Sequence, residues 1–453
     1  EKKPSWKGLG TNKLSEEIYS CYGDNVGLIC IGPAGEMRMC AAGISNNDIN
    51  KIPSRYAARG GLGAVMGSKG LKAIVIDDTG CKGVPVKDPD AFTKAAKELV
   101  RALKEHEVTN IGLRALGTAD LIEYIDAIGA LPTRNFREGQ FEAASKVTGA
   151  YMAQVVEQRK GKGKMGHPCS PGCIIQCSNI YPDKDGEIIC SPIEYESIWA
   201  LGPNLGIGDL DIIARLNAAC NDIGLDTIET GGTLGVLMDA GLLEFGDGKG
   251  AMELLSEVEK GSPIGRIVGM GVEGAGKAYG VNRVPVVKGQ GIPAYDPRGI
   301  KGLGVTYATS TMGADHTAGH TGHQEVFKIG GDYDPLTVEG KGALSYDRQV
   351  KTAFIDSTGL CAFVTLSTQD LPYGDRAIID LINAKYGCNW TDEDVIKYGK
   401  EILRIEREFN KLAGLTKSHD RLPEFMLEEP LPPHNHVFDV PGVELEKANS
   451  SHD

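Results

Sequence analysis

The sequence predicts an α+β fold in which a small β-containing N-terminal piece precedes two mainly α-helical domains. Two short apolar runs bounded by turn residues, 25–36 and 71–78, have the length and composition of strands. From residue 88 onward apolar residues recur at helical spacing, and a Pro- and Gly-rich stretch near residue 286 interrupts them. We therefore expect domains at 1–85, 86–285 and 286–453.

The N-terminal piece contains the two predicted strands, "NVGLICIGPAGE" and "LKAIVIDD", separated by the glycine-rich stretch "SRYAARGGLGAVMGSKG". Two strands are too few for an independently stable sheet. We expect a larger N-terminal sheet domain to be supplied by a separate chain or by a further segment.

The helical domains carry recognisable helix start signals. Asp88 followed by Pro89 is a good N-cap with proline at the first helical position. Thr391 with Asp394 resembles a capping box with Asp in place of Glu. The C-terminal stretch 428–453 contains several prolines and is expected to form a surface arm or to be partly disordered.

Composition narrows the class of protein. The net charge is −13 and no basic stripe stands out, so a nucleic-acid partner is not expected. The sequence has no run of eighteen apolar residues and no apolar signal core, which predicts a cytoplasmic protein without a membrane span. Eleven cysteines, an odd number in a chain of enzyme size, fit a reducing compartment with some thiols kept for metal. The 60 glycines are roughly twice the usual share of about 7% and gather in tight motifs, which favours backbone packed closely against a ligand.

Three cysteines stand four residues apart in "HPCSPGCIIQC", at Cys169, Cys173 and Cys177. Cys173 and Cys177 would share one face of a helix. Three clustered cysteines with one remote cysteine are typical of cubane iron–sulfur clusters; zinc and unligated buried thiols are the alternatives. Cys361 is a candidate fourth ligand, although spacing alone does not select it over Cys190, Cys220 or Cys388.

A faint internal repeat links two helix ends. "NDIGLD" at 221–226 and "DSTGLC" at 356–361 each follow an amphipathic helix and share Gly-Leu at the same positions. One interpretation is two helices ended by C-cap glycines; the other is two equivalent ligand-holding corners.

Three further groups of residues carry chemistry. Arg55 and Arg59 flank small residues before a glycine turn, which suits a phosphate, although the motif is neither a Walker loop nor a dinucleotide fingerprint. His316, with His320 and His323, has a spacing that suits either a metal or a structural role. Glu194 and Glu196 lie beside aromatic residues; if buried, a carboxyl there would have a raised pKa suited to acid–base work, and otherwise it belongs to a solvated helix start.

In combination, the stretches "AARGGLGAVMGSKGLKAI", "CSPGCIIQC", "EYESIWALGPNLGI", "NDIGLDTIETGG", "AYDPRG" and "DSTGLC" resemble the tungsten-containing aldehyde:ferredoxin oxidoreductase family. The similarity runs in order over residues 10–430. The resemblance implies one tungsten, or molybdenum, held between two pterin cofactors, with a [4Fe–4S] cluster nearby. Residues 1–85 would be the C-terminal part of a β-sheet domain that forms a saddle for the cofactor.

The resemblance assigns roles residue by residue. It implies that Cys169, Cys173, Cys177 and Cys361 ligate the cluster. The cofactor would be held by Arg55, Tyr56 and Arg59 at the pterin phosphates, by Asn221, Leu225 and Asp226 at the first corner, and by Asp356 and Leu360 at the second. A magnesium ion bridging the phosphates is a further option. Glu196 and His316 would lie beside the metal as catalytic residues.

Three departures from the family pattern stand out. The first cysteine spacing is Cys-x3-Cys instead of Cys-x2-Cys, Asn221 replaces an Asp, and Ala318 replaces a Lys.

The implied reaction is oxidation of a small aldehyde to a carboxylate, with ferredoxin or an iron–sulfur subunit accepting the electrons, in a protein expected to be oligomeric. The alternatives are a tungsten-dependent aromatic-ring reductase acting on a benzoyl thioester and a non-catalytic iron–sulfur electron-transfer subunit.

Overall fold

The structure is a computed structural model that describes residues 3–449. Contacts gather the chain into two compact units. Unit 1 comprises Glu1–Gly80 and Leu116–Ala294, and unit 2 comprises Cys81–Ala115 and Tyr295–Asp453. This grouping places the helix that follows Asp88 with the C-terminal residues, whereas the three-part division at 1–85, 86–285 and 286–453 stays a prediction.

Unit 1 begins with a four-stranded antiparallel sheet in the order β3-β2-β1-β4. The strands are β1 (Gly27–Cys30), β2 (Ile44–Asn46), β3 (Arg55–Ala57) and β4 (Ala73–Ile76). The strands predicted at 25–36 and 71–78 are confirmed as β1 and β4, which pair with Ile29 opposite Ile74. The first prediction was too long, because Pro33–Glu36 form a short helix that begins at the proline. Strands β2 and β3 were not predicted, because three residues carry too little periodicity to distinguish a strand from a loop.

One face of this sheet is buried by the first helix, α1 (Thr11–Tyr22). Leu14 and Ile18 of α1 form a core cluster with Leu28 and Cys30 of β1. The N-terminal sheet, which carries the first candidate site residues, is therefore stabilised by its own hydrophobic core.

The rest of unit 1 is mainly helical, as predicted, with two small sheets ordered β5-β6-β7 and β8-β9. Its elements are α2 (Pro33–Glu36), α3 (Leu62–Ser68), α6 (Leu121–Ala127), α7 (Gly149–Arg159), β5 (Lys164–His167), β6 (Ser178–Pro182), β7 (Ile188–Cys190), α8 (Tyr195–Leu201), α9 (Leu210–Ile223), α10 (Thr227–Asp239), α11 (Gly248–Lys260), α12 (Pro263–Gly269), α13 (Gly271–Tyr279), β8 (Val286–Val287) and β9 (Gln290–Gly291). Helix α10 is buried from Ile228 to Met238, so it forms the centre of this part of the unit.

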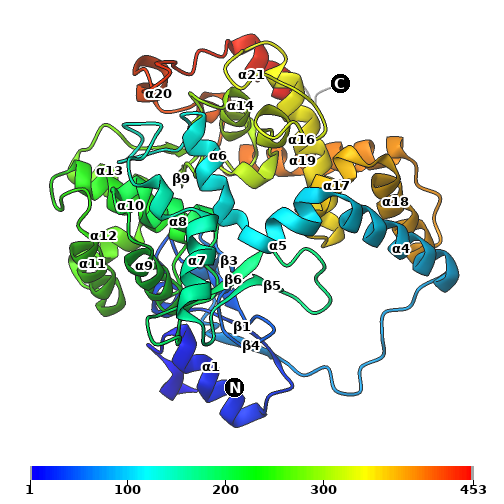
Figure 1. Ribbon diagram of the computed structural model, residues 1–453, viewed down its shortest axis with the longest axis horizontal. Helices are drawn as coiled ribbons and strands as arrows, with labels where there is room; N and C mark the ends of the chain where they lie inside the picture. The colour runs from blue at the N-terminus through cyan, green and yellow to red at the C-terminus, as the bar shows by residue number, and fades with distance from the viewer. Residues whose placement is uncertain (1–2, 450–453) are drawn as a thin grey trace. The chain divides into compact units, whose positions relative to one another are not determined.

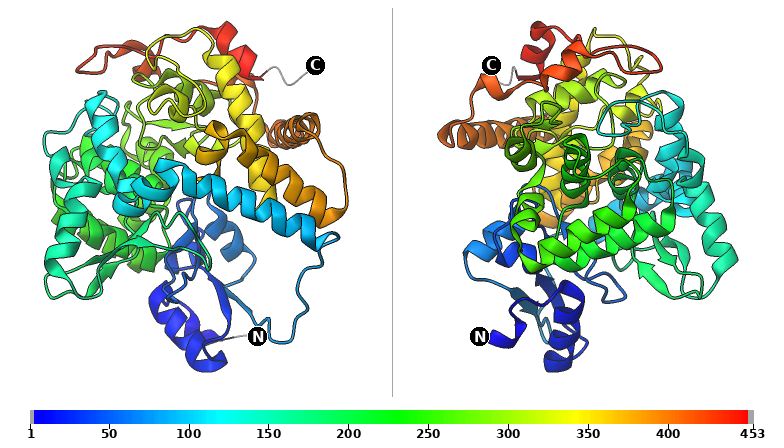
Figure 2. Two further views of the ribbon diagram at one scale, coloured as in Figure 1. Left: turned by 45° about the vertical axis from the view of Figure 1, so that its right-hand side comes forward. Right: turned by 90° about the vertical axis from the view of Figure 1, so that its left-hand side faces the viewer.

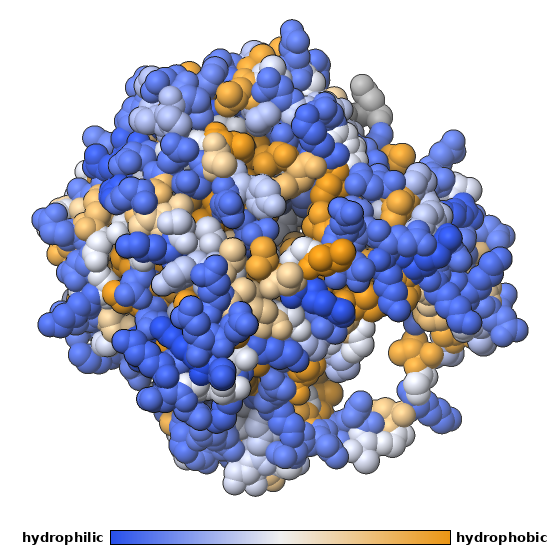
Figure 3. Space-filling view, viewed as in Figure 1, coloured by the Kyte–Doolittle hydropathy of each residue, from blue (hydrophilic) through white to orange (hydrophobic). Residues whose placement is uncertain are grey.

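Unit 2 is helical. Its elements are α4 (Pro89–Glu105), α14 (Lys301–Thr309), the 3-10 turn η6 (His316–Ala318), α15 (Gly322–Glu325), α16 (Lys341–Thr358), α17 (Val364–Asp370), α18 (Pro372–Tyr386), α19 (Asp392–Leu412), α20 (Glu424–Glu428) and α21 (Gly442–Asn449); α5 (Leu113–Leu116) lies at the boundary between the units. Helix α4 packs along α18 (Figures 1 and 2). The outer side of α4 is hydrophilic (Figure 3), which explains the amphipathic pattern read from its sequence.

Both predicted helix caps are confirmed. The Asp88 side chain accepts a hydrogen bond from the Ala91 amide at 2.9 Å at the start of α4. Thr391 and Asp394 form a complete capping box at the start of α19, so Asp replaces Glu there without loss of either bond.

The two repeated corners are helix C-caps. Gly224 ends α9 at φ 86°, and Gly359 ends α16 at φ 74°, both in the left-handed region that favours glycine. The C-cap interpretation of the repeat is therefore confirmed. The ligand-holding interpretation stays a prediction.

Two local predictions were wrong. Residues 169–177 contain no helix, so Cys173 and Cys177 do not share a helix face; two prolines and the positive φ of Gly172 and Gln176 break any helical run. The C-terminal stretch is not a surface arm up to residue 449. Phe438 is 3% exposed and α21 packs on α16, because single apolar residues between the prolines are enough to anchor it.

Within residues 3–449 no helix has both the length and the apolar character that a membrane span needs.

Candidate functional site

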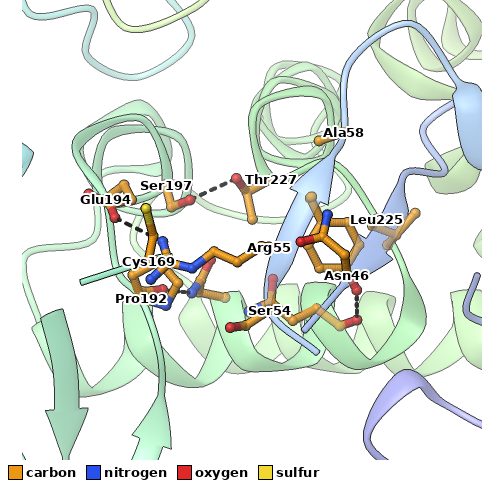
Figure 4. A pocket seen from close by; sticks show the side chains of 13 residues that line it. Asn46, Ser54, Arg55, Ala58, Cys169, Pro192, Glu194, Ser197, Leu225 and Thr227 are labelled. Carbon is orange, nitrogen blue, oxygen red and sulfur yellow. Dashed lines mark hydrogen bonds and ion pairs between the residues drawn. The ribbon is translucent and has the colours of Figure 1, made fainter. Parts of the chain in front are cut away.

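Unit 1 contains a pocket of about 360 Å³ between the N-terminal sheet and the helices that follow it. Figure 4 shows Arg55 extending from β3 toward Glu194 and Cys169, while Asn46 and Leu225 lie at the other end. Most of the lining side chains are neutral hydrogen-bonding groups, with Arg55 as the one cation among them. The lining residues are Asn46, Ser54, Arg55, Tyr56, Ala58, Cys169, Pro192, Glu194, Ser197, Asn217, Asn221, Leu225 and Thr227.

The α9–α10 corner is joined to the N-terminal sheet by backbone contacts. The Gly43 amide donates to the Gly224 carbonyl at 3.0 Å, and the Asp226 amide donates to the Ala41 carbonyl at 2.9 Å. A Cβ on Gly32 would lie 2.2 Å from the Ile223 carbonyl oxygen, so only glycine permits this approach. These contacts hold Asn221 and Leu225 at the pocket wall.

Arg55 is held at the pocket but retains donor capacity. Its Nη2 donates to Ser178 at 2.8 Å, and its Nη1 lies 3.7 Å from the Glu194 carboxylate. Glu194 is fixed in turn by hydrogen bonds from Ser178 at 3.0 Å and Thr118 at 2.6 Å. The buried Nε of Arg55 has no hydrogen-bond partner among the described residues. Such a donor fits an anionic group such as a phosphate.

Arg59 lies in an acidic cluster beside the first corner. Its Nε is 3.6 Å from Asp226, and its Nη2 is 3.9 Å from Glu229 and donates to the Gly291 carbonyl. Asp226 also caps α10 by accepting from the Ile228 amide at 3.0 Å. Glu229 was not among the predicted site residues. Its signal is a carboxylate near the start of the helix "TIETGGTLGVLMD", in which no residue between it and the final Asp239 is charged.

Glu196 lies in the first turn of α8, and its Oε2 accepts from the Ala294 amide at 3.0 Å. The neighbouring Tyr195 is buried and donates its hydroxyl to the Ala294 carbonyl at 2.6 Å. Trp199 on the same helix donates its indole N–H to the Pro132 carbonyl at 2.7 Å. The helix that presents Glu196 is thus anchored by two buried aromatic side chains.

The cysteine trio lies on the loop between β5 and β6. Cys169 lines the pocket, and the Cys173 sulfur accepts from the Gln176 amide at 3.4 Å. Gly117, at φ 67°, approaches the Cys177 carbonyl so closely that a Cβ there would lie 2.9 Å from its oxygen. Among residues 3–449 no three His, Cys, Asp or Glu side chains are grouped as the ligands of one metal ion, so the cluster ligands stay predicted.

The cysteines that are candidates for the fourth ligand of the iron–sulfur cluster differ in their environments. Burial raises the pKa of both Cys190 and Cys220 to about 12, and these residues are 5% and 0% exposed. A cluster must reach the sulfur of its ligand, so these two buried thiols are poorer candidates than an exposed cysteine. Cys361 is exposed and follows the Gly359 corner in unit 2, which leaves it accessible to a ligand.

In unit 2, His316 begins η6, and its ring is one of a row of aromatic side chains. The His316 and His320 ring centroids are 5.9 Å apart, and those of His320 and His323 are 4.3 Å apart and stacked. Tyr295 lies 5.7 Å from His316 and 5.2 Å from His320. The three histidines do not lie on one continuous helix, since η6 and α15 are separate.

The second corner carries the other predicted cofactor residues. Asp356 lies in the last turn of α16, where burial and the nearby carboxylates of Asp315 and Glu406 raise its pKa. The Leu360 amide donates to the Thr358 hydroxyl at 3.1 Å as the chain leaves the helix toward Cys361. The structure therefore brings Arg55, Tyr56, Asn221, Leu225 and Cys169 to one pocket in unit 1, while His316, Asp356, Leu360 and Cys361 belong to unit 2.

Acidification is expected to destabilise the fold through His323. Burial, together with the charges of Arg348 and His316, lowers the pKa of His323 to about 4 from the usual 6.5. The unfolded chain therefore binds this proton at a higher pH than the folded chain, and the free energy of unfolding falls as the pH drops from 6.5 toward 4. Between about pH 7 and pH 5 the loss is roughly 2 kcal/mol. Urea unfolding at both pH values checks this, and a His323→Asn variant with an unchanged pH dependence would contradict it.

Comparison with family models gives two matches that together span most of the chain. Residues 1–78 match the family model "Aldehyde ferredoxin oxidoreductase, N-terminal domain", and residues 94–449 match "Aldehyde ferredoxin oxidoreductase, domains 2 & 3". The second match alone covers more than half of the chain.

Curated proteins and solved structures agree with these matches. The tungsten-containing aldehyde ferredoxin oxidoreductase of Pyrococcus furiosus is 36% identical over 426 residues, which cover 90% of this chain and 67% of that protein. The Thermococcus kodakarensis enzyme of the same name is 36% identical over 443 residues, covering 94% and 68%. A chain of the active-site complex BamBC of benzoyl coenzyme A reductase, solved with 1,5-dienoyl-CoA, has a TM-score of 0.73 at 17% identity. The alignment covers 98% of this chain and 73% of that chain, and it shows the same fold.

Proposed function

Because the chain belongs to the aldehyde ferredoxin oxidoreductase family of tungsten-containing oxidoreductases, we propose that it oxidises an aldehyde to the corresponding carboxylate and passes the electrons to ferredoxin. The family implies a tungsten pterin cofactor. The observation that carries the proposal is the unit 1 pocket, where a cation with an unsatisfied buried donor, Arg55, meets the Gly-Leu corner and Cys169.

The pocket residues, together with predicted cofactor residues outside the pocket, would hold such a cofactor. Arg55 and Arg59 would bind pterin phosphates, with a magnesium ion as an optional bridge between them. Asn221, Leu225 and Asp226 would hold one pterin and Asp356 with Leu360 the other. Because Asn221 offers an amide where the family pattern has a carboxylate, it would both donate and accept at the pterin edge.

A [4Fe–4S] cluster would be ligated by Cys169, Cys173, Cys177 and Cys361. When bound, the tungsten pterin cofactor and the [4Fe–4S] cluster would supply the electron-accepting chemistry. In the reaction, aldehyde plus water yields carboxylic acid, two protons and two electrons, and ferredoxin takes the electrons one at a time.

Two side chains would act on the substrate. Glu196 would accept a proton from the attacking water, since a carboxylate at the start of an anchored helix can hold that position. His316 would donate a hydrogen bond to the aldehyde oxygen and carry a proton away.

The partners remain part of the proposal. They are ferredoxin or an iron–sulfur subunit, a separate chain or segment completing the N-terminal sheet, and further copies in an oligomer. The cytoplasmic location stays a prediction.

The second candidate is reduction of an aromatic ring in a benzoyl thioester, which the fold shared with the benzoyl coenzyme A reductase chain favours. Elemental analysis and two assays on anaerobically purified protein distinguish the candidates. Tungsten with iron and ferredoxin-linked oxidation of short aldehydes is the expected result. Activity only toward benzoyl thioesters would replace it with the second candidate, and iron without tungsten would indicate a non-catalytic electron-transfer subunit.

A further inference from the structure

Glu229 is a buried carboxylate with both oxygens engaged by backbone amides. It lies in the first turn of α10 and is 7% exposed. Its Oε1 accepts from the Val272 amide at 2.9 Å, and its Oε2 accepts from the Gly291 amide at 2.9 Å. One side chain thus joins α10 to the start of α13 and to β9.

Two glycines make room for this carboxylate. Gly271 has φ 84°, and a Cβ there would lie 2.6 Å from Oε1 of Glu229. A Cβ on Gly291 would lie 3.0 Å from Oε2. The carboxylate therefore fits a closely shaped seat, in which its two oxygens have little freedom to move.

Gly291 links this seat to Arg59. The Gly291 N–H donates to Glu229, while its carbonyl accepts from Nη2 of Arg59. The same Nη2 lies 3.9 Å from Oε2 of Glu229, and Nε of Arg59 lies 3.6 Å from Asp226. The guanidinium is held from two sides, and its orientation depends on where Gly291 is fixed.

The charges support this linkage. Burial raises the pKa of Glu229, while the positive charge of Arg59 acts in the opposite direction. A buried carboxylate needs a cation or several donors to offset its lost hydration, and here it has both. A glutamine could not replace it, because its NH2 group would face one of the two amides that the carboxylate accepts from.

We propose that Glu229 is a positioning residue that fixes the guanidinium of Arg59, through Gly291, in the orientation in which Arg59 meets an anionic phosphate of the bound cofactor. This inference rests on the proposed function, because it takes from it the role of Arg59.

The test measures binding of inorganic pyrophosphate to the full chain without cofactor, by calorimetry, in wild type, Glu229→Gln and Arg59→Met. We expect Glu229→Gln to weaken binding about 10- to 100-fold, as the loss of a well-oriented charged hydrogen bond does. Glu36→Gln is the matched control. Glu36 also joins a backbone amide, that of Gly8, to a cation, Lys72, in unit 1, and we expect its loss to leave binding unchanged.

A second readout needs no ligand. With 15N-labelled arginine, exchange of the Arg59 Nε–H with water is expected to be faster in Glu229→Gln than in wild type. The shorter Glu229→Asp retains the charge and is expected to show the same effect, so it provides the test if the glutamine variant does not fold. The positioning role of Glu229 would be overturned, and the proposed function left standing, by one combination of results. In it, the folded Glu229 variants exchange the Arg59 Nε–H and bind pyrophosphate as wild type does, while Arg59→Met loses binding. Wild-type binding in Arg59→Met would instead overturn the role of Arg59 in the proposed function.

Discussion

A Cys361→Ala variant is expected to lose the intact [4Fe–4S] cluster and with it all electron transfer to ferredoxin. A cubane cluster needs four thiolates, and the loop between β5 and β6 offers three. Without the cluster the electrons released by aldehyde oxidation have no route to the protein partner. Iron analysis and electron paramagnetic resonance of the reduced protein measure the loss of the cluster, and a ferredoxin-linked assay measures the loss of electron transfer.

The controls are the cysteines that spacing alone does not exclude. Alanine variants of Cys190, Cys220 and Cys388 are expected to retain iron and the spectroscopic signal of the wild type. Cys190 and Cys220 are buried thiols with raised pKa values, and the Cys388 sulfur donates to the Asn383 side chain at 3.2 Å. Loss of the signal in one of these variants, with Cys361→Ala unaffected, would assign the fourth ligand elsewhere.

A Glu196→Gln variant is expected to lower kcat for aldehyde oxidation by about 10²- to 10⁴-fold, the usual contribution of a general base. Glutamine retains the shape of the side chain and its acceptor for the Ala294 amide, so the fold and the tungsten content should stay at wild-type levels. The measurement is steady-state kinetics normalised to tungsten per chain.

Glu273→Gln provides a matched control for this variant. Glu273 also lies in the first turn of a unit 1 helix, α13, but pairs on the surface with Lys277 at 2.9 Å. Its replacement is expected to leave kcat unchanged. Full activity of Glu196→Gln with tungsten bound would remove Glu196 from the role of base.

The sequence predicted the elements whose signals are local. The long helices and the caps at Asp88 and Thr391 are specified by residues within a few positions of each other, and they are confirmed. The short strands β2 and β3 were not predicted because each is defined only by pairing with a neighbouring strand: β2 pairs with β1, and β3 pairs with β2. In the cysteine loop the four-residue spacing predicted a shared helix face, but the two prolines prevent a helix there.

Residues of the candidate site could be predicted from the sequence only where they belong to a recognisable motif or lie next to one. Asn221 and Leu225 lie in a family-like stretch, Arg55 and Tyr56 directly precede another, and the structure places all four on one pocket. Asn46, Asn217 and Thr227 line the same pocket without a motif, since neutral polar residues are common throughout a sequence. Glu229 was missed because its partners, the Val272 and Gly291 amides, lie more than 40 residues away along the chain.

The close approach of Gly32 to the α9 C-terminus has a consequence for affinity. Two main chains that touch without intervening side chains leave no rotamers to reorganise, and the hydrogen bonds at Gly43 and Asp226 fasten them on either side. The pocket wall at the α9–α10 corner is therefore preorganised before a ligand binds. An occupant meets little entropic penalty for ordering that wall, so a larger fraction of its contact energy is expressed as tight retention.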